Sequence, residues 1–208
     1  LVQYNGLEDE VYSLEDSLWE DKVSVVFQDH HGTLWIGHAS GNISRKKGNK
    51  IEKFTFSEGN PTKRITSIVE DLEGRIWFAT YGEGIYYFEN QKLFNLMMDN
   101  GLTDDNIYQL TLDSKGKIWA ATDGGISIID LSIKDKKNRI QTLSMKDGLP
   151  DNIVRNLVFE TPEKLWIGMQ DSGFCAYSIQ NKSFQTFSGW ENGGVTGLSV
   201  LNKELWIG

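Results

Sequence analysis

The side chains of this sequence that are best suited to bind a small molecule combine aromatic rings with amides and charged groups, and they fall in irregular, often glycine-bearing segments. They are Trp19, His38, Arg64, Tyr81, Asn106, Asp123, Asn152, Gln170 and Trp190. Aromatic rings stack on the apolar C–H faces of a sugar, while amides and carboxylates exchange hydrogen bonds with its hydroxyl groups. The sequence therefore predicts a polar site for an oligosaccharide or another small ligand.

Catalytic motifs are absent from the sequence. It has no Gly-x-Ser-x-Gly elbow, no phosphate-cradling glycine loop and no His-Glu-x-x-His pair. The adjacent His30 and His31 lack a third metal ligand nearby in sequence. Hydrolysis of a glycosidic bond needs two carboxyl groups about 5–9.5 Å apart, yet the acids that stand out recur in register, as turn residues do: Asp29, Asp71, Asp113 and Glu160. We expect no enzymatic activity, no cofactor and no metal.

Composition narrows the classes of function. Among the 208 residues, 21 Lys and Arg face 29 Asp and Glu, which gives a net charge of −8 and disfavours nucleic acid as a partner. The residues are 39% hydrophobic, enough for a folded core, but no segment approaches the roughly 20 apolar residues of a membrane span, so we expect no membrane contact. Leu1 to Glu10 lacks the pattern of a signal peptide, and the one cysteine, Cys175, excludes an internal disulfide.

Tryptophan sets an internal repeat that organises the whole chain. Each repeating indole lies in a short apolar segment, at Trp35, Trp77, Trp119, Trp166 and Trp206, with successive spacings of 42, 42, 47 and 40 residues. The longest spacing coincides with a lysine-rich insertion around residues 133–139. A fixed period of about 42 residues is typical of a propeller or a solenoid. We expect these five tryptophans to pack between repeats rather than to bind ligand.

Each repeat reads as four short strands. A β-branched first strand, expected at residues 23–27, 65–69, 107–111 and 153–157, leads into an Asp-x-x-Gly turn in three of the four repeats and then into the tryptophan strand. Third and fourth strands follow, for example at residues 85–88 and 92–96. Four strands in about 42 residues, without a helical period, predict an all-β fold of four-stranded antiparallel propeller blades over residues 1–208.

The order of strands at the two ends allows two interpretations. Sliding the sequence by 84 residues places Leu1 on Ile85 and Trp35 on Trp119, so the chain opens in a third strand and closes in a second. The two ends could then form one composite blade and close a five-bladed ring without open sheet edges. Alternatively, the 208 residues are an excerpt from a longer array of such repeats.

Alternation of strand direction places the candidate residues on one face. The loops between second and third strands, and the connections from one blade to the next, emerge together, whereas the Asp-x-x-Gly turns lie on the opposite face. Trp19 and Trp190 fall outside the tryptophan register, so either could bind ligand or cover the core edge. Asn106 and Asn152 both precede a first strand, where asparagine also caps or turns the backbone.

The repeat resembles the two-component regulator propeller repeat. The stretches that carry the resemblance are Asp71-Leu72-Glu73-Gly74-Arg75-Ile76-Trp77, Gly101-Leu102-Thr103-Asp104-Asp105-Asn106-Ile107 and Gly148-Leu149-Pro150-Asp151-Asn152-Ile153. The likeness covers the whole chain and weakens at the last two repeats, where Glu163 stands in place of the turn glycine and residues 200–203 lack the aspartate.

The resemblance implies a sensor role. The family forms the extracytoplasmic, periplasmic half of bacterial sensor histidine kinases, including hybrid two-component systems that respond to oligosaccharides. Its repeats commonly build seven-bladed propellers, so the resemblance implies that the chain is an excerpt of a seven-bladed one. It also implies that the chain binds a ligand and signals by a rearrangement of propellers or protomers. Its partners would then be the rest of the sensor protein and a second copy of it. A protein-docking propeller, or a propeller glycoside hydrolase or lyase whose active site is assembled from distant blades, remains an alternative.

Overall fold

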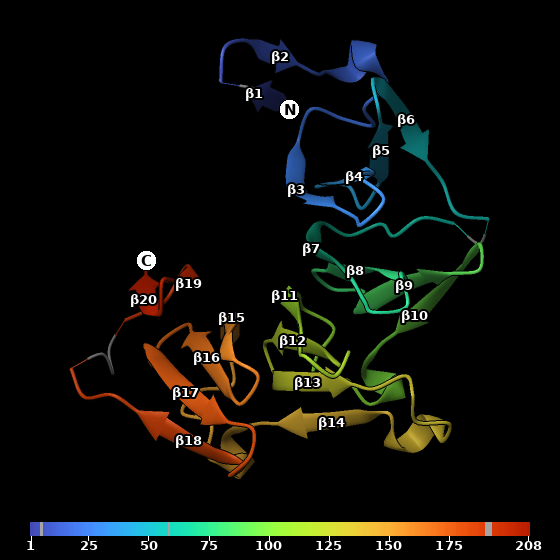
Figure 1. The fold of residues 1–208 in the computed structure, drawn as a ribbon. Helices are drawn as coiled ribbons and strands as arrows, with labels where there is room; N and C mark the ends of the chain where they lie inside the picture. The colour runs from blue at the N-terminus through green and yellow to red at the C-terminus, as the bar shows by residue number, and fades with distance from the viewer. Residues whose placement is uncertain (5, 58, 190–192) are drawn as a thin grey trace. The chain divides into compact units, whose positions relative to one another are not determined.

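The computed structural model describes residues 1–4, 6–57, 59–189 and 193–208. Across these residues the chain forms β-strands, turns and four short 3-10 helices, with no α-helix. The strands make four four-stranded sheets and two two-stranded sheets (Figure 1). Each four-stranded sheet is a meander of consecutive strands, which is the architecture of a propeller blade. The structure thus confirms the predicted all-β fold class of four-stranded blades.

The chain divides into two compact units, Leu1–Asn95 and Leu96–Gly208, which we call unit 1 and unit 2. Unit 1 holds one two-stranded sheet and two blades. Its elements are β1 (Val2–Tyr4), β2 (Asp9–Val11), η1 (Leu14–Asp16), β3 (Val23–Gln28), β4 (Leu34–His38), β5 (Ile43–Lys47), β6 (Lys50–Phe54), β7 (Ile65–Glu70), β8 (Ile76–Thr80), β9 (Ile85–Glu89) and β10 (Lys92–Leu96), whose last residue belongs to unit 2.

Unit 2 holds two blades and one two-stranded sheet. Its elements are η2 (Met98–Asn100), β11 (Ile107–Leu112), β12 (Ile118–Thr122), β13 (Gly125–Ile129), η3 (Lys136–Asn138), β14 (Ile140–Leu143), η4 (Met145–Asp147), β15 (Val154–Thr161), β16 (Lys164–Met169), β17 (Phe174–Ser178), β18 (Ser183–Thr186), β19 (Leu198–Leu201) and β20 (Glu204–Ile207). The predicted lysine-rich insertion is the β13–β14 connection that contains η3.

The turn between the first and second strand of each blade is held by a carboxylate that also binds the repeating tryptophan. The indole Nε1–H donates to this carboxylate six residues earlier in every blade: Trp35 to Asp29 at 2.9 Å, Trp77 to Asp71 at 2.8 Å, Trp119 to Asp113 at 3.1 Å and Trp166 to Glu160 at 2.8 Å. In three blades the aspartate also accepts backbone N–H groups two and four residues ahead. A buried indole N–H needs such a partner, so these acids serve the fold, as predicted.

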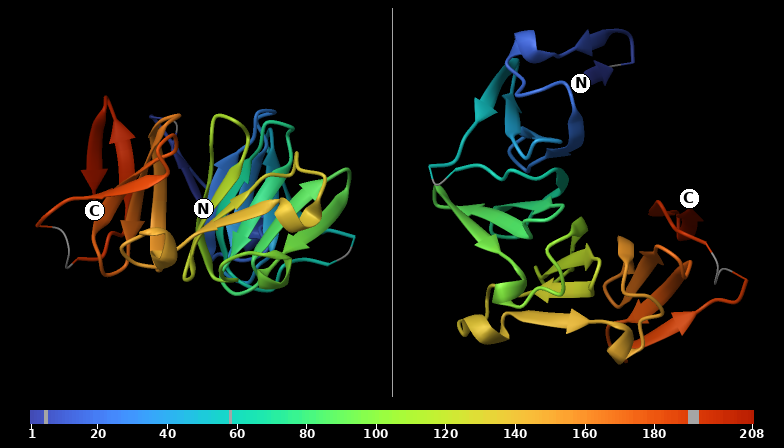
Figure 2. Two further views of the ribbon diagram at one scale, coloured as in Figure 1. Left: turned by 90° about the horizontal axis from the view of Figure 1, so that it is seen from below. Right: turned by 180° about the vertical axis from the view of Figure 1, so that it is seen from behind.

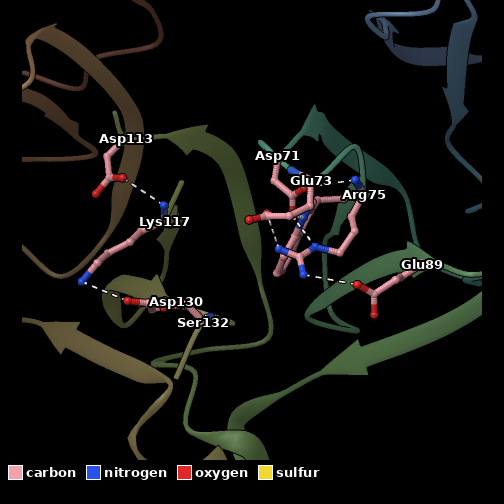
Figure 3. A network of polar contacts seen from close by, with 9 residues as sticks. Asp71, Glu73, Arg75, Glu89, Asp113, Lys117, Asp130 and Ser132 are labelled. Atoms are coloured by element: carbon pink, nitrogen blue, oxygen red, sulfur yellow. Dashed lines mark hydrogen bonds and ion pairs between the residues drawn. The ribbon is translucent and has the colours of Figure 1, made fainter. Parts of the chain in front are cut away.

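A basic residue at this turn pairs with a carboxylate in three blades: Lys164 Nζ lies 2.9 Å from Glu160 Oε2, and Figure 3 shows the pairs of Arg75 and Lys117. Arg75 Nε lies 2.5 Å from Asp71 Oδ2, and its other nitrogens lie 2.7 Å from Glu73 Oε2 and 3.3 Å from Glu89 Oε1. In the corresponding place of unit 2, Lys117 Nζ lies 3.3 Å from Asp130 Oδ2. The pairs with Glu89 and Asp130 join the turn to the end of the third strand of the same blade.

The repeating tryptophans fill the space between successive blades of a unit. Trp35 packs with Ile65 and Phe78 of the next blade in unit 1, and Trp119 packs with Val154 and Leu157 of the next blade in unit 2. Both views of Figure 2 show β11–β14 and β15–β18 side by side. The predicted packing role is therefore confirmed at these positions.

Small residues two positions after the tryptophan let the next repeat approach the second strand closely. A Cβ added to Gly37 would lie 2.7 Å from Ile65 Cγ2, and one added to Gly168 would lie 2.7 Å from Val195 Cγ1. Polar side chains fasten the same contact: Ser24 Oγ donates to the Ile65 carbonyl at 2.6 Å. Close packing between blades thus dictates the residue type two positions after each tryptophan.

Two expectations need correction. Trp206 is 59% exposed, because it lies in the two-stranded sheet β19–β20 rather than between two blades. The first strand of the last complete blade begins at Val154, one residue later than expected. The strands β1–β2 form a two-stranded sheet in unit 1 and β19–β20 form one in unit 2; that they join as one composite blade stays a prediction.

Candidate ligand-binding site

The backbone fixes the place where the predicted ligand-binding loops begin. In three of the four complete blades, the residue four positions after the tryptophan donates its N–H to the residue just before the first strand. Tyr81 N donates to the Arg64 carbonyl at 3.1 Å, and Gln170 N donates to the Ile153 carbonyl at 2.9 Å. The same bond joins Ala39 to Lys22 at 3.1 Å. These three blades thus hold the two residues side by side, whatever their side chains are.

Three positions of each blade meet at this end of the sheet, and we call them the variable positions. The residue before the first strand is Lys22, Arg64, Asn106 or Ile153. The second residue of the first strand is Ser24, Thr66, Tyr108 or Arg155. The residue four after the tryptophan is Ala39, Tyr81, Asp123 or Gln170. The backbone arrangement is similar from blade to blade, while the residue types at these positions vary. Such variation is expected where a repeat protein binds a ligand.

In unit 2 the variable positions of two blades form one hydrogen-bonded group, the polar cluster. Asn106 Nδ2 donates to Asp123 Oδ2 at 2.9 Å, and the Tyr108 hydroxyl donates to Asp123 Oδ1 at 2.6 Å. The guanidinium carbon of Arg155 lies 3.9 Å from the centre of the Tyr108 ring, and Arg155 Nη2 donates to Gln170 Oε1. All five side chains belong to half-buried residues. The cluster therefore spans β11 and β15 with its polar groups at the surface.

The structure brings together three of the nine predicted residues, Asn106, Asp123 and Gln170. Sequence reasoning missed the two that connect them, Tyr108 and Arg155. Both lie inside first strands, among apolar and β-branched neighbours. An aromatic phenol and a guanidinium at the same strand position of consecutive repeats is the signal that identifies them.

Two predicted residues of unit 1 share one hydroxyl group. Trp19 N donates to Ser44 Oγ at 3.0 Å, and His38 Nε2 lies 2.8 Å from the same oxygen. His38 is fully buried, and its Nδ1 is a buried nitrogen without a hydrogen-bond partner among the described residues. Burial lowers the pKa of His38, and the nearby Glu20 carboxylate opposes this shift. Ser44 therefore ties the connection before β3 to the blade, and the burial of His38 argues against contact with a ligand.

The other predicted residues of unit 1 are more accessible. The Trp19 ring is half-buried, with its Nε1–H 3.4 Å from the Phe54 carbonyl and Lys53 Nζ 5.2 Å from the ring centre. Arg64 is exposed and Tyr81 is 46% exposed. Trp19 thus lies over the fourth strand of its blade, whereas Arg64 and Tyr81 occupy variable positions at the start of β7. A ligand contact by these residues stays a prediction.

Asn152 has a local backbone role. Its Oδ1 accepts the Met145 N–H at 2.9 Å, as Asp105 Oδ1 accepts the Met98 N–H at 2.8 Å. Asn152 therefore corresponds to Asp105 rather than to Asn106, and it caps the connection that contains η4. The interpretation as a capping residue therefore fits Asn152. It does not fit Asn106, whose side-chain amide donates to Asp123 instead. Trp190 lies outside the described residues.

A cavity of about 440 Å³ lies elsewhere in unit 1. Its lining includes Val2, Tyr12 and Val26 together with Gly32 of the β3–β4 turn and Gly48 of the β5–β6 turn. None of the predicted site residues lines it. It lies at the turn end of the blade, opposite to the variable positions.

Within the described part of the chain, no group of three or more His, Cys, Asp or Glu residues is arranged to hold a metal ion. The same residues contain no helix with the length and apolar character needed to cross a bilayer. The buried Cys175 thiol has its pKa raised to about 12 by burial, which makes it a poor nucleophile.

Comparison with known proteins points to one family and one fold. Residues 101–124 match the family model "Two component regulator propeller". No curated protein matches the chain. Two similar solved structures are extracellular domains of hybrid two component systems from B. thetaiotaomicron. BT3049 has 20% identity and a TM-score of 0.81, with 95% of this chain and 29% of that chain covered. BT4673 has 20% identity and a TM-score of 0.74, with 91% and 28% covered.

An enzyme shares the fold. Virginiamycin B lyase from Staphylococcus aureus has 18% identity and a TM-score of 0.69, with 89% of this chain and 62% of that chain covered. Identities at this level establish the fold alone, and this chain spans less than a third of the length of the B. thetaiotaomicron domains. The chain is accordingly a β-propeller protein in which residues 101–124 match the two-component regulator propeller repeat.

Proposed function

We propose that this chain is the ligand-binding part of an extracytoplasmic two-component sensor and that it detects an oligosaccharide. The observation that carries the proposal is the polar cluster, which joins Asn106, Tyr108, Asp123, Arg155 and Gln170 at the variable positions of two blades. An amide, a phenol, a carboxylate and a guanidinium together offer both donors and acceptors, which suits a ligand rich in hydroxyl groups.

One end of each blade has the same structural contact throughout and the other end varies, which supports ligand binding at the end with the variable positions. The carboxylate–indole bond at the opposite end recurs in all four complete blades. At the variable positions the residue type changes from blade to blade, while the backbone bond recurs in three of the four blades. A purely structural repeat has no need for such variation.

The comparisons support the sensor role. The matching family model and the two extracellular domains from B. thetaiotaomicron belong to two-component signalling. We propose that the chain faces outside the cytoplasm and forms part of a larger, dimeric sensor. Ligand binding would shift the packing of propellers or protomers, because a ligand changes an equilibrium only through unequal affinity for the two states.

Calorimetric titration of the intact chain against a panel of oligosaccharides tests the proposal. At least one saccharide should bind, and Asp123→Ala should weaken that binding by about tenfold or more, because it removes the acceptor of two hydrogen bonds. Glu163→Ala is the matched control: it removes an exposed carboxylate from the β15–β16 turn at the other end of the blade. It should leave the affinity unchanged.

Two results would overturn the proposal. If no saccharide binds while a protein partner does, the chain is a docking platform. If the intact chain releases reducing ends from the panel, it is a hydrolase or lyase.

A further inference from the structure

Arg155 differs from the arginines that stabilise the fold. Arg45 pairs with Glu52, and Arg75 pairs with three carboxylates. Arg155 is held by neutral groups: the face of the Tyr108 ring and the side-chain oxygen of Gln170. No carboxylate among the described residues lies within ion-pair distance of Arg155. The side chain of Arg155 is therefore held in position while no carboxylate balances its positive charge.

The nearest acid in the cluster is already occupied. Both carboxylate oxygens of Asp123 accept hydrogen bonds, one from Asn106 and one from Tyr108. These bonds fix the Tyr108 ring, which in turn supports the guanidinium 3.9 Å above it. Asp123 thus orients Arg155 through Tyr108 rather than pairing with it.

A guanidinium fixed in this way is a receptor for an anion. Its planar array of N–H donors matches both oxygens of a carboxylate, and little side-chain freedom is lost when the ion pair forms. Stacking on an aromatic ring and one bond to an amide oxygen leave further N–H donors unused. Arg155 belongs to a half-buried residue of β15, at the end of the blade where the variable positions lie.

We propose that the saccharide bound at the polar cluster is acidic and that Arg155 binds its carboxylate. This inference rests on the proposed function and names the class of its ligand: an oligosaccharide that contains uronic acid. The neutral members of the cluster, Asn106 and Gln170, bind hydroxyl groups beside the carboxylate. Tyr108 is a positioning residue that holds the guanidinium.

The test uses pairs of ligands that differ only in charge. The probes are galacturonate and glucuronate disaccharides, their methyl esters, and neutral disaccharides of the same size. The intact chain should bind an acidic disaccharide roughly tenfold to a hundredfold more tightly than its methyl ester, because the ester loses a charge-assisted hydrogen bond. Higher salt concentration should weaken binding of the acid more than binding of the ester.

Arg155→Met should remove this discrimination, so that acid and ester bind the variant with similar affinity. Arg155→Lys keeps the charge but not the planar fork, and it should restore part of the preference. Acid and ester, each bound to the unchanged chain and to Arg155→Met, form a double-mutant cycle that gives the interaction energy between the ligand charge and Arg155. A merely structural role of Arg155 would give no such interaction energy. Lys115→Met is the control, because it removes an exposed cation from the β11–β12 turn.

Each outcome decides a different question. If neutral disaccharides bind as tightly as acidic ones, or if the acid–ester difference persists in Arg155→Met, the inference about the ligand class is wrong and the oligosaccharide site stands. If no saccharide of either kind binds, the proposed function itself fails. A melting temperature of Arg155→Met close to that of the unchanged chain shows that loss of binding is not loss of folding.

Discussion

The Asp71 carboxylate accepts the indole N–H of Trp77 at 2.8 Å, with both side chains buried in the blade. The same oxygen lies 2.5 Å from Arg75 Nε. One acid therefore closes the turn, satisfies the indole and balances a cation. This combination explains why aspartate and tryptophan keep a separation of six residues in three blades, and why Glu160 can take the same role in the fourth.

Removal of the Asp71 carboxylate should be costly. Asp71→Ala leaves the Trp77 indole N–H and the half-buried Arg75 without their shared partner, and we expect a loss of about 3 kcal/mol in the free energy of unfolding. Glu73→Gln removes an exposed partner of the same arginine and should cost less than about 1 kcal/mol. Urea unfolding of both variants measures the difference. Equal losses would contradict the central role of Asp71.

Close approach between blades predicts the effect of a single methyl group. Gly168→Ala places a Cβ 2.7 Å from Val195 Cγ1, and it should destabilise the fold by about 1–3 kcal/mol through overpacking. The matched control is Gly197→Ala, because a Cβ at Gly197 meets no atom within 4 Å. Thermal unfolding of the two variants compares the loss of stability at a closely packed glycine with that at a glycine in open space. A tolerated Gly168→Ala would show that the strands are further apart than described.

Burial of His38 should make stability depend on pH. Its pKa is lowered in the folded chain, so the unfolded chain takes up the proton more readily, and stability falls as the pH drops below the ordinary value of 6.5. Above that pH the histidine is neutral in both states and contributes no pH dependence. The opposing Glu20 carboxylate limits the effect.

His38→Thr tests this directly, since Thr80 and Thr122 occupy the same position in the next two blades. The variant should show a flatter stability profile than the unchanged chain between about pH 6.5 and 5, as measured by melting temperature across that range. The slope is compared rather than the absolute stability, because the smaller side chain also changes packing. Identical slopes would show that His38 does not carry the pH dependence.

The blades could be predicted from the sequence because their determinants are local. The tryptophan, the acid six residues before it and the small residue two after it act within one turn or against the next strand. The polar cluster could not be predicted in full, because Tyr108 and Arg155 are 47 positions apart and meet only when β11 and β15 pack together. Taken alone, Tyr108 and Arg155 each look in the sequence like an ordinary strand residue.

Local backbone chemistry explains the other differences. The two asparagines before first strands looked equivalent, but the position of Gly148 relative to Gly101 aligns Asn152 with Asp105. Both residues accept a backbone N–H from the preceding 3-10 turn. His38 was expected in a loop, yet β4 extends to include it, and the alternation of the strand turns its side chain inward.

Hydrogen–deuterium exchange of the intact chain, with and without a saturating saccharide from the titration panel, tests most directly whether ligand is read at the variable positions. Protection should appear in residues 104–108, 122–125, 153–156 and 169–172, which contain the polar cluster and its flanking backbone. Protection confined to the turns at residues 29–33, 71–75, 113–117 and 160–164 would place the ligand at the opposite end of the blades and contradict the account.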